Sequence, residues 1–168
     1  KKSFKILSNK IKKKYKPKKI LEIGSNDGSF LENFNKDRTI GIEPCANVEK
    51  ITKKLKFNTI QDYWGINLAK RILKKFDKVD LIYSANTISH IKNLNEVFKS
   101  INLVLSDEGV LIIEDPSLLE CLKRNTYDQF YNEHIYVFSF ISLENILKKY
   151  NLKIFKVENL DRHGGSNR

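Results

Sequence analysis

The sequence predicts an α/β fold: a doubly wound, mostly parallel sheet with helices on both faces. Short β-rich apolar runs alternate with helical patterns from residue 19 onward, and such alternation is typical of parallel sheets. Runs such as KILEIG (19–24) and VDLIYSA (79–85) are largely apolar rather than alternating, which indicates strands that are buried on both faces. We therefore expect right-handed crossover connections, with the helices as the covering layers.

The expected elements follow from these runs and from helical spacing. Strands are expected at 19–24, 39–43, 57–61, 79–85, 109–115 and 152–158. Helices are expected at 29–34, 46–55, 66–76, 94–105 and 142–150. Ligands of such folds bind beyond the carboxyl ends of the strands, so a site is expected near Gly24, Glu43, Gln61, Ala85 and Asp115.

Length and composition fit one domain over 1–168. The chain has 168 residues, of which 40% are hydrophobic and 30% charged, enough for a core. It has no apolar run near the ~20 residues that span a bilayer and no secretory signal pattern. Cys45 and Cys121 are too few for a zinc site or a disulfide framework, so we expect a cytoplasmic protein. Because the sequence contains no Met, we also expect it to be a fragment or a processed product.

The net charge of +11 is concentrated in the first 19 residues, KKSFKILSNKIKKKYKPKK. Phe4, Leu7, Ile11 and Tyr15 recur there at helical spacing, which predicts a Lys-rich amphipathic helix over 1–17 that leads into the domain. Two interpretations of the lysines remain: a solvated helix face, or a surface that attracts a phosphate-bearing partner. They are compatible if the substrate is anionic.

The first predicted strand runs into a glycine-containing loop, EIGSNDGSF. Glycine lets a ligand approach the backbone closely, and the pattern is not the G-x-G-x-x-G of dinucleotide sites. Its acidic residues disfavour a pyrophosphate and suit a cationic ligand. The candidate cofactor-binding residues of this loop are Glu22, Gly24, Ser25, Asn26, Asp27 and Gly28.

Glu43, followed by Pro44, ends the second predicted strand 19 residues after Gly24, where a carboxylate can accept both ribose hydroxyls of a nucleoside. A nucleoside that carries positive charge and no phosphate is S-adenosylmethionine. The pattern resembles the first motif, and the acidic residue after it, of class I methyltransferases. That resemblance places Asp62 and Tyr63, with Ala85, in the cofactor site. Trp64 is either part of the adenine pocket or a filler of the core edge.

The stretch FYNEHIYVFS (130–139) brings a phenol, a carboxylate and an imidazole together at Tyr131, Glu133 and His134. It is either a catalytic cluster or an ordinary polar seam. His90 follows the predicted end of the fourth strand at Ala85 by five residues, with Asn86 between them. Both should therefore lie on the ligand side of the sheet.

The order LEIGSNDGSFLENF, GIEPCANV, SANTISHIKNL, GVLIIEDPSLLE, YDQFYNEHIYVFS, HGGSNR resembles the sugar C-methyltransferase family across nearly the whole chain. The resemblance implies transfer of a methyl group to a carbon of a nucleotide-linked ketosugar, through an enolate. It also implies a catalytic core, with the last strand of the sheet cut short and with His163 in the turn that leads into it. Other small-molecule or RNA methyltransferases, and a non-catalytic module of the same fold, remain as alternatives.

The same resemblance implies roles at five positions. An enolate needs a base that titrates near neutral pH and donors for the oxyanion, and an imidazole titrates near pH 6.5. His134 or Tyr131 is the expected base, Tyr131 a donor to the enolate oxygen, and Glu133 an orienting or field-tuning group. Asn86 and His90 complete the set. The three histidines lack metal-ligand spacing, so no metal is expected. Nucleic acid is disfavoured because SANTISHI differs from the motif of enzymes that methylate base nitrogens; the oligomeric state is not predicted.

Overall fold

The computed structural model describes residues 1–162 and 164–168. Its strands in chain order are β1 (Ile20–Ile23), β2 (Thr39–Ile42), β3 (Thr59–Ile60), β4 (Val79–Ala85), β5 (Leu105–Pro116), β6 (Asn159–Leu160) and β7 (Ser166–Asn167). Its α-helices are α1 (Lys2–Lys14), α2 (Ala46–Lys54), α3 (Ile66–Phe76), α4 (Leu94–Val104), α5 (Leu118–Arg124) and α6 (Phe140–Lys148).

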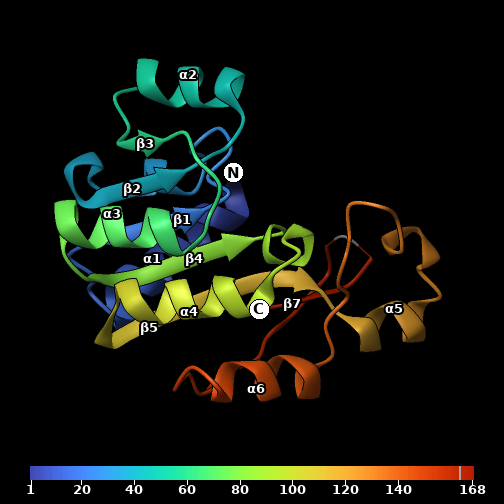
Figure 1. Cartoon of the computed structure of the whole chain (residues 1–168). Coiled ribbons are helices and arrows are strands. Elements are labelled where there is room, and N and C mark those ends of the chain that lie inside the picture. Colours follow the sequence, from blue (N-terminus) through green and yellow to red (C-terminus); the bar gives the residue numbers. More distant parts are fainter. Residues whose placement is uncertain (163) are drawn as a thin grey trace.

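The strands form one sheet in the order β3-β2-β1-β4-β5-β7-β6 (Figure 1). The strands β1 to β5 pair in parallel, with Glu22 opposite Gly41 and Tyr83. β7 pairs antiparallel with β5, with Asp115 opposite Asn167, and β6 pairs antiparallel with β7. The predicted doubly wound, mostly parallel sheet is therefore confirmed, and its strand order reverses between β1 and β4.

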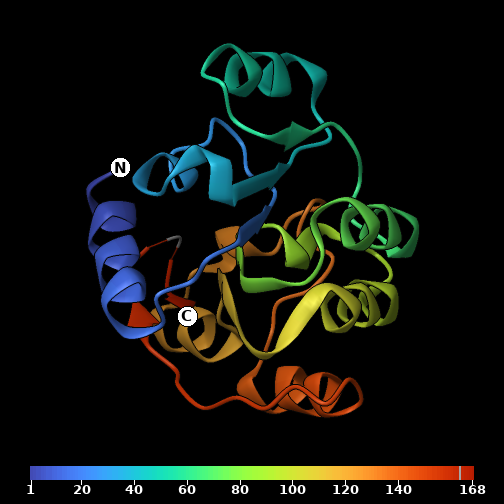
Figure 2. The same ribbon diagram turned by 90° about the vertical axis from the view of Figure 1, so that its left-hand side faces the viewer.

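Helices cover both faces of the sheet (Figure 2). On one face α1 packs Leu7 and Ile11 against Phe30, Leu81 and Tyr83. On the opposite face α3 and α4 contribute to the larger core cluster, to which α6 adds a further helix. All four residues of β1 are buried, as expected for a central strand covered on both sides. The sheet thus holds the carboxyl ends of β1, β2 and β4 in fixed register.

The prediction of a strand over 152–158 is wrong. In the structure no strand is assigned to this segment, although Glu158 at its end exchanges two backbone hydrogen bonds with Arg168, and the strand is β6, Asn159–Leu160. A strand needs a neighbour for its backbone groups, and in the described residues β7 is only two residues long. The N-terminal helix also ends earlier than predicted, at Lys14, because Lys16 has a φ of 46° and precedes Pro17, where the α conformation is disfavoured.

Candidate functional site

A cavity of about 670 Å³ lies at the carboxyl ends of β1, β2 and β4. It is built from the loops that follow the first four strands, together with one residue of β5 and two of the β6–β7 connection and β7. The predicted residues that line it are Glu22, Gly24, Ser25, Asn26, Asp27, Glu43, Pro44, Asp62, Tyr63, Ala85, Asn86 and His90. The structure therefore gathers, at one place, residues that are up to 68 positions apart in the sequence.

Gly28 does not line the cavity. Its φ is 77°, and a Cβ added there would lie 3.2 Å from the ring of Phe57. Its role is thus in the loop's shape and packing. Gly24 also has a positive φ, and its Cβ would lie 2.2 Å from Oγ1 of Thr87, so only glycine lets the β1 loop pass the β4 loop so closely.

Glu43 ties the β1 loop to the end of β2. Its Oε2 accepts a hydrogen bond from the Asn26 backbone N–H at 2.9 Å, and its Oε1 accepts one from the Cys45 N–H at 2.9 Å. A carboxylate has about four acceptor positions, so the two backbone donors leave acceptor capacity that faces the cavity. Glu43 is 7% exposed and lines the cavity, so this capacity is available to hydrogen-bond donors of a bound molecule.

The cavity floor is acidic. Burial, reinforced by the charges of Asp27, Glu43 and Glu114, raises the pKa of Glu22 well above its ordinary value. Glu22 Oε2 and Ser25 Oγ are buried and have no hydrogen-bond partner in the described residues. Buried polar atoms normally have partners. Their state here indicates a site shaped for a ligand that donates hydrogen bonds and carries positive charge.

Of the residues after β3, Asp62 and Tyr63 lie at the cavity's outer end, and Tyr63 is 80% exposed. Asp62 is held by an ion pair with Arg71 at 2.7 Å. Trp64 belongs to the main core cluster, and its indole N–H donates to the Val97 carbonyl at 3.3 Å. Of the two readings of Trp64, the structure favours the core-edge one, although one side of the residue reaches the cavity.

The residues after β4 lie at the cavity's centre. Asn86 has a φ of 50°, its N–H donates to the Glu114 carbonyl at 2.6 Å, and its buried Oδ1 has no hydrogen-bond partner within residues 1–162 and 164–168. His90 ends a short 3-10 helix, Ile88–His90. Desolvation by burial, and then the charge of His134, lower the pKa of His90. His90 is therefore neutral at neutral pH, and its buried Nε2 is unpartnered among the described residues.

The Tyr131 and His134 side chains are joined by a hydrogen bond of 3.1 Å between the phenol oxygen and Nε2. The other ring nitrogen, Nδ1, is 2.7 Å from the Gln129 carbonyl. A carbonyl only accepts, so Nδ1 carries the hydrogen and Nε2 of the neutral ring accepts from the Tyr131 hydroxyl. This is a directed chain, from phenol to imidazole to backbone.

The hydrogen-bonded side chains of Tyr131 and His134 are connected to the cavity by a contact with His90. Neither Tyr131 nor His134 lines the cavity itself, but the His90 and His134 rings meet edge to face with centroids 4.9 Å apart. Glu133 is exposed, and the group that contacts Nδ1 of His134 is the Gln129 carbonyl. The charge of Glu133 only partly opposes the lowering of the His90 pKa by burial and by His134.

Asp115, at the end of β5, is linked by hydrogen bonds through Ser89 to both segments that carry the histidines. Its Oδ1 accepts from Ser89 Oγ at 2.7 Å, and the Ser89 carbonyl accepts from the Tyr136 N–H at 3.1 Å. Ser89 thus connects the His90 turn to the loop that carries His134. Burial, only partly opposed by the Ser89 hydrogen bonds, raises the pKa of Asp115 to about 7.

Asp115 should make the protein less stable as the pH rises from about 4 to about 7. The folded state keeps the proton in this window and the unfolded chain, with a pKa of about 3.9, releases it. The unfolded state then binds fewer protons, so the free energy of unfolding falls with pH. In Asp115→Asn the fall should be smaller by at least about 1 kcal/mol, as measured by urea unfolding at pH 4.5 and 7.5. An equal fall in both proteins would contradict this assignment.

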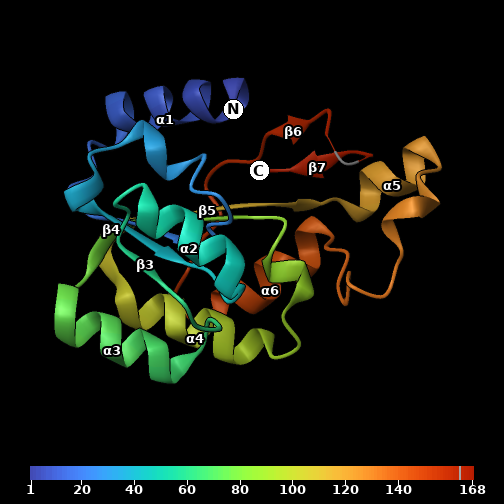
Figure 3. The same cartoon turned by 90° about the horizontal axis from the view of Figure 1, so that it is seen from above.

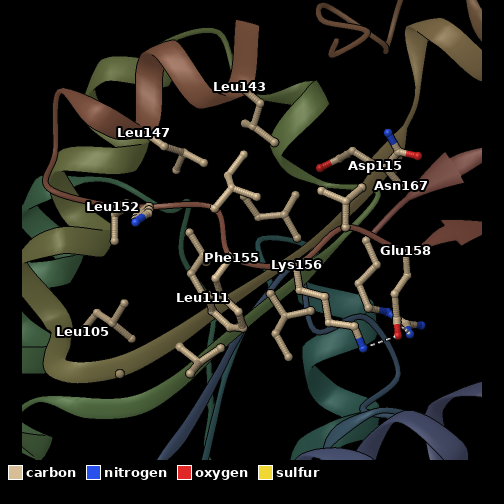
Figure 4. A pocket seen from close by; sticks show the side chains of 18 of the residues that line it. Leu105, Leu111, Asp115, Leu143, Leu147, Leu152, Phe155, Lys156, Glu158 and Asn167 are labelled. Atoms are coloured by element: carbon tan, nitrogen blue, oxygen red, sulfur yellow. Dashed lines mark hydrogen bonds and ion pairs between the residues drawn. The ribbon is translucent and has the colours of Figure 1, made fainter. Parts of the chain in front are cut away.

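A second cavity, of about 620 Å³, runs along the outer edge of β5 (Figure 4). Among the described residues, β5 is paired on that side only at Asp115 and Pro116. Leu143 and Leu147 of α6, together with Phe155, line the groove, and the Lys156–Glu158 ion pair lies at its rim. It has an apolar lining and shows no converging acid–base pair, so the chemistry is expected at the strand ends instead.

Other sequence predictions have simpler outcomes. His163, which the sequence places in a turn before the last strand, lies outside the described residues. Within residues 1–162 and 164–168, no three His, Cys, Asp or Glu side chains are grouped as metal ligands. In the same ranges, no helix has the length and apolar character needed to cross a membrane.

Two functional groups had no signal in the sequence. The Gln129 carbonyl is a backbone atom, which residue type does not reveal. Arg162 lines the cavity from the β6–β7 connection, where it contacts residues distant in sequence, Glu114 and Ser3.

Comparisons with known proteins agree with this geometry. A family model described as a methyltransferase domain matches residues 4–157. The C-methyltransferase NovU from Streptomyces niveus is 30% identical over 149 residues, which are 88% of this chain and 36% of NovU. The chain thus spans little more than a third of that relative's length.

Several solved structures share the fold. YcgJ from Bacillus subtilis superimposes with a TM-score of 0.71 at 14% identity, covering 95% of this chain and 73% of YcgJ. A SAM-dependent methyltransferase from Archaeoglobus fulgidus gives 0.69 at 19% identity, covering 94% and 73%. The plantazolicin methyltransferase BpumL, solved in complex with SAH, gives 0.65 at 18% identity, covering 88% and 61%.

Proposed function

The chain belongs to the methyltransferase domain family, and from this premise we propose that it binds S-adenosylmethionine and methylates a carbon beside the keto group of a nucleotide-linked sugar. The observation that carries the proposal is the phenol–imidazole–carbonyl chain of Tyr131, His134 and Gln129. It lies next to an acidic cavity at the strand ends. The cavity suits the cofactor, and the hydrogen-bonded series of Tyr131, His134 and the Gln129 carbonyl suits removal of a proton from carbon.

The residues present fit S-adenosylmethionine. Its nucleoside carries a sulfonium and no phosphate, which agrees with the carboxylates around the β1 loop. Glu43 has acceptor capacity left for ribose hydroxyls, and the unpartnered Ser25 Oγ and Glu22 Oε2 can bond to polar groups of the ligand. Solved relatives of the same fold include one in complex with SAH, which supports the same cofactor here.

When bound, S-adenosylmethionine supplies an electrophilic methyl group. This chain's own residues must make the acceptor carbon nucleophilic. The Tyr131 oxygen takes the proton beside the keto group as the hydroxyl's own proton passes to Nε2 of His134, and the C–H electron pair becomes the enolate. The Gln129 carbonyl then stabilises the resulting imidazolium through Nδ1–H. The proton therefore ends on His134.

His90 is placed to serve the enolate oxygen. It lines the cavity, its pKa is lowered, and its unpartnered Nε2 can donate as N–H without carrying a charge of its own. A neutral donor preorganised in a buried site stabilises a developing oxyanion without a cost of reorganisation. Asn86, beside it, is a second group that can orient the substrate.

The proposed acceptor atom, carbon, and the proposed substrate, a sugar, are supported by different observations. NovU is named a C-methyltransferase, and the ordered motifs of this chain resemble sugar C-methyltransferases. Nucleic acid is a weaker candidate as substrate, because the lysines of α1 do not line the cavity. Among the described residues of α1, Phe4 lines it.

The proposal is tested by incubating the chain with ¹³C-methyl S-adenosylmethionine and a series of nucleotide-linked ketosugars. A new C–CH₃ group beside the keto carbon is expected in the NMR spectrum. Label on oxygen or nitrogen would contradict the proposed acceptor atom. Proton exchange at that carbon in D₂O, measured with S-adenosylhomocysteine in place of the methyl donor, reports the enolate step separately.

A further inference from the structure

Arg162 occupies an unusual position at the cavity, in the connection between β6 and β7, which Figure 3 shows near the start of α1. Its Nη2 pairs with Glu114, and its Nη1 is 3.4 Å from Ser3 Oγ. The guanidinium lies 5.9 Å from the centroid of the Phe4 ring. The head group is therefore held by Glu114 of β5 and by Ser3 and Phe4 of α1, although its side chain is still 28% exposed.

Arg162 also differs in charge from the other ionisable residues that line the cavity. Five carboxylates line the cavity, those of Glu22, Asp27, Glu43, Asp62 and Glu114. Among the described lining residues, Arg162 is the only lysine or arginine. A single fixed guanidinium in an acidic cavity is the place where the anionic part of a mainly cationic ligand would bind.

The order of the strands gives the direction of the ligand. Glu43 and Asp62 follow β2 and β3, on one side of β1, whereas Glu114 lies on β5, on the other side. A nucleoside held at Glu43 therefore has its amino-acid end toward β4 and β5. Glu22 of β1 and Glu114 of β5 both line the cavity, so carboxylates also lie at this end.

We propose that Arg162 binds the α-carboxylate of S-adenosylmethionine. This inference rests on the proposed cofactor, and it does not depend on the sugar substrate. The cofactor has two cationic groups, the sulfonium and the α-ammonium, and one anionic group. The two cations match the carboxylates around the β1 loop, and the carboxylate matches Arg162. A guanidinium has five N–H donors, and the described residues engage two of its nitrogens, so donors remain for a carboxylate.

The pairing with Glu114 gives this subsite its rigidity. Glu114 is 4% exposed and also accepts from Arg168 Nε at 2.7 Å, while Arg168 pairs with Glu158 at 2.8 Å. Glu114 thus holds two arginines, but only Arg162 lines the cofactor cavity; Arg168 lines the groove along β5 instead. Arg168 is therefore a matched control: it has the same side chain and the same partner but lies at a different cavity.

The experiment measures calorimetric affinities for two ligands that differ in the carboxylate alone: S-adenosylmethionine and its decarboxylated form. We expect Arg162→Gln to weaken the binding of S-adenosylmethionine roughly ten- to hundredfold, as for a lost charge-assisted hydrogen bond. The affinity for the decarboxylated ligand should change by less than about twofold, and Arg168→Gln should leave both affinities near those of the wild type. Arg162→Lys, which keeps the charge without the fork, should retain part of the affinity.

Three outcomes would overturn the inference. The first is an equal loss for both ligands in Arg162→Gln, which would indicate a general structural effect. The second is no loss for either. The third is an unchanged cofactor affinity with weakened binding of a nucleotide-linked sugar, which would assign Arg162 to the acceptor's phosphates. A wild-type chain that binds neither ligand would contradict the proposed cofactor itself, and is thereby distinguishable from these outcomes.

Discussion

Replacing Tyr131 with phenylalanine is expected to lower the rate of methyl transfer by about 10²- to 10⁴-fold, the usual contribution of a positioned acid–base group. The phenol is the outward end of the hydrogen-bonded chain, and His134 is behind it, with Nε2 occupied by the Tyr131 hydroxyl. Without the phenol oxygen, the group proposed to take the substrate's proton is lost, and Nε2 of His134, although freed, has no hydroxyl that relays the proton to it. His134→Gln should lower the rate to a similar extent, because the proton then has no acceptor.

The measurement is the rate of label transfer and, separately, of proton exchange beside the keto group in D₂O. Both rates should fall together in Tyr131→Phe, while cofactor affinity stays within about twofold of the wild type. Tyr127→Phe is the matched control: Tyr127 precedes the cluster on the same loop and is 69% exposed. Exchange at the wild-type rate in Tyr131→Phe would show that another group removes the proton.

Replacing Glu43 with alanine should weaken the binding of S-adenosylmethionine at least about 100-fold. Two effects add. The ribose hydroxyls lose their acceptor, and the Asn26 and Cys45 N–H groups lose the carboxylate that holds the β1 loop against β2. The affinity is read by calorimetry, with circular dichroism confirming that the variant is folded.

Glu49→Ala supplies the control for this variant. Glu49 is a glutamate of α2 that is buried to a similar degree, at 4% exposure, but it does not line the cavity. Its loss should lower the melting temperature without weakening the cofactor's binding at equal folded concentration. If Glu49→Ala weakened binding as much as Glu43→Ala, the effect would reflect the stability of the β2–β3 region and not a ribose contact.

The sequence predicts well those elements whose signals are local. The helix 66–76 and the strand 79–85 match α3 and β4 residue for residue, because an apolar period and flanking turn residues mark both ends. The helix α5 was missed because its leucines face outward: Leu119 and Leu122 are more than half exposed while Glu120 and Cys121 are buried. Hydrophobic periodicity cannot reveal a helix whose pattern is inverted.

Some residues of the candidate site can likewise be predicted from local sequence signals, and others cannot. The β1 loop and Glu43 are predictable, since glycines and an acidic residue at strand ends have a local physical reason. The sequence does not predict which of Tyr131 and His134 is the proposed base. The answer depends on the hydrogen bond from His134 to the Gln129 carbonyl, and a backbone carbonyl is present in every residue type. Arg162 is equally hidden, since its place is fixed by Glu114 and Ser3, far from it in the sequence.

The most direct test of the central claim, that the strand-end cavity binds the cofactor, is a crystal structure of the chain with S-adenosylhomocysteine. We predict density for the ligand across the ends of β2, β1 and β4, with the ribose hydroxyls on Glu43 and the amino-acid end toward Glu22 and Arg162. Density in the groove along β5, or a ligand that leaves Glu43 without a contact, would contradict the account.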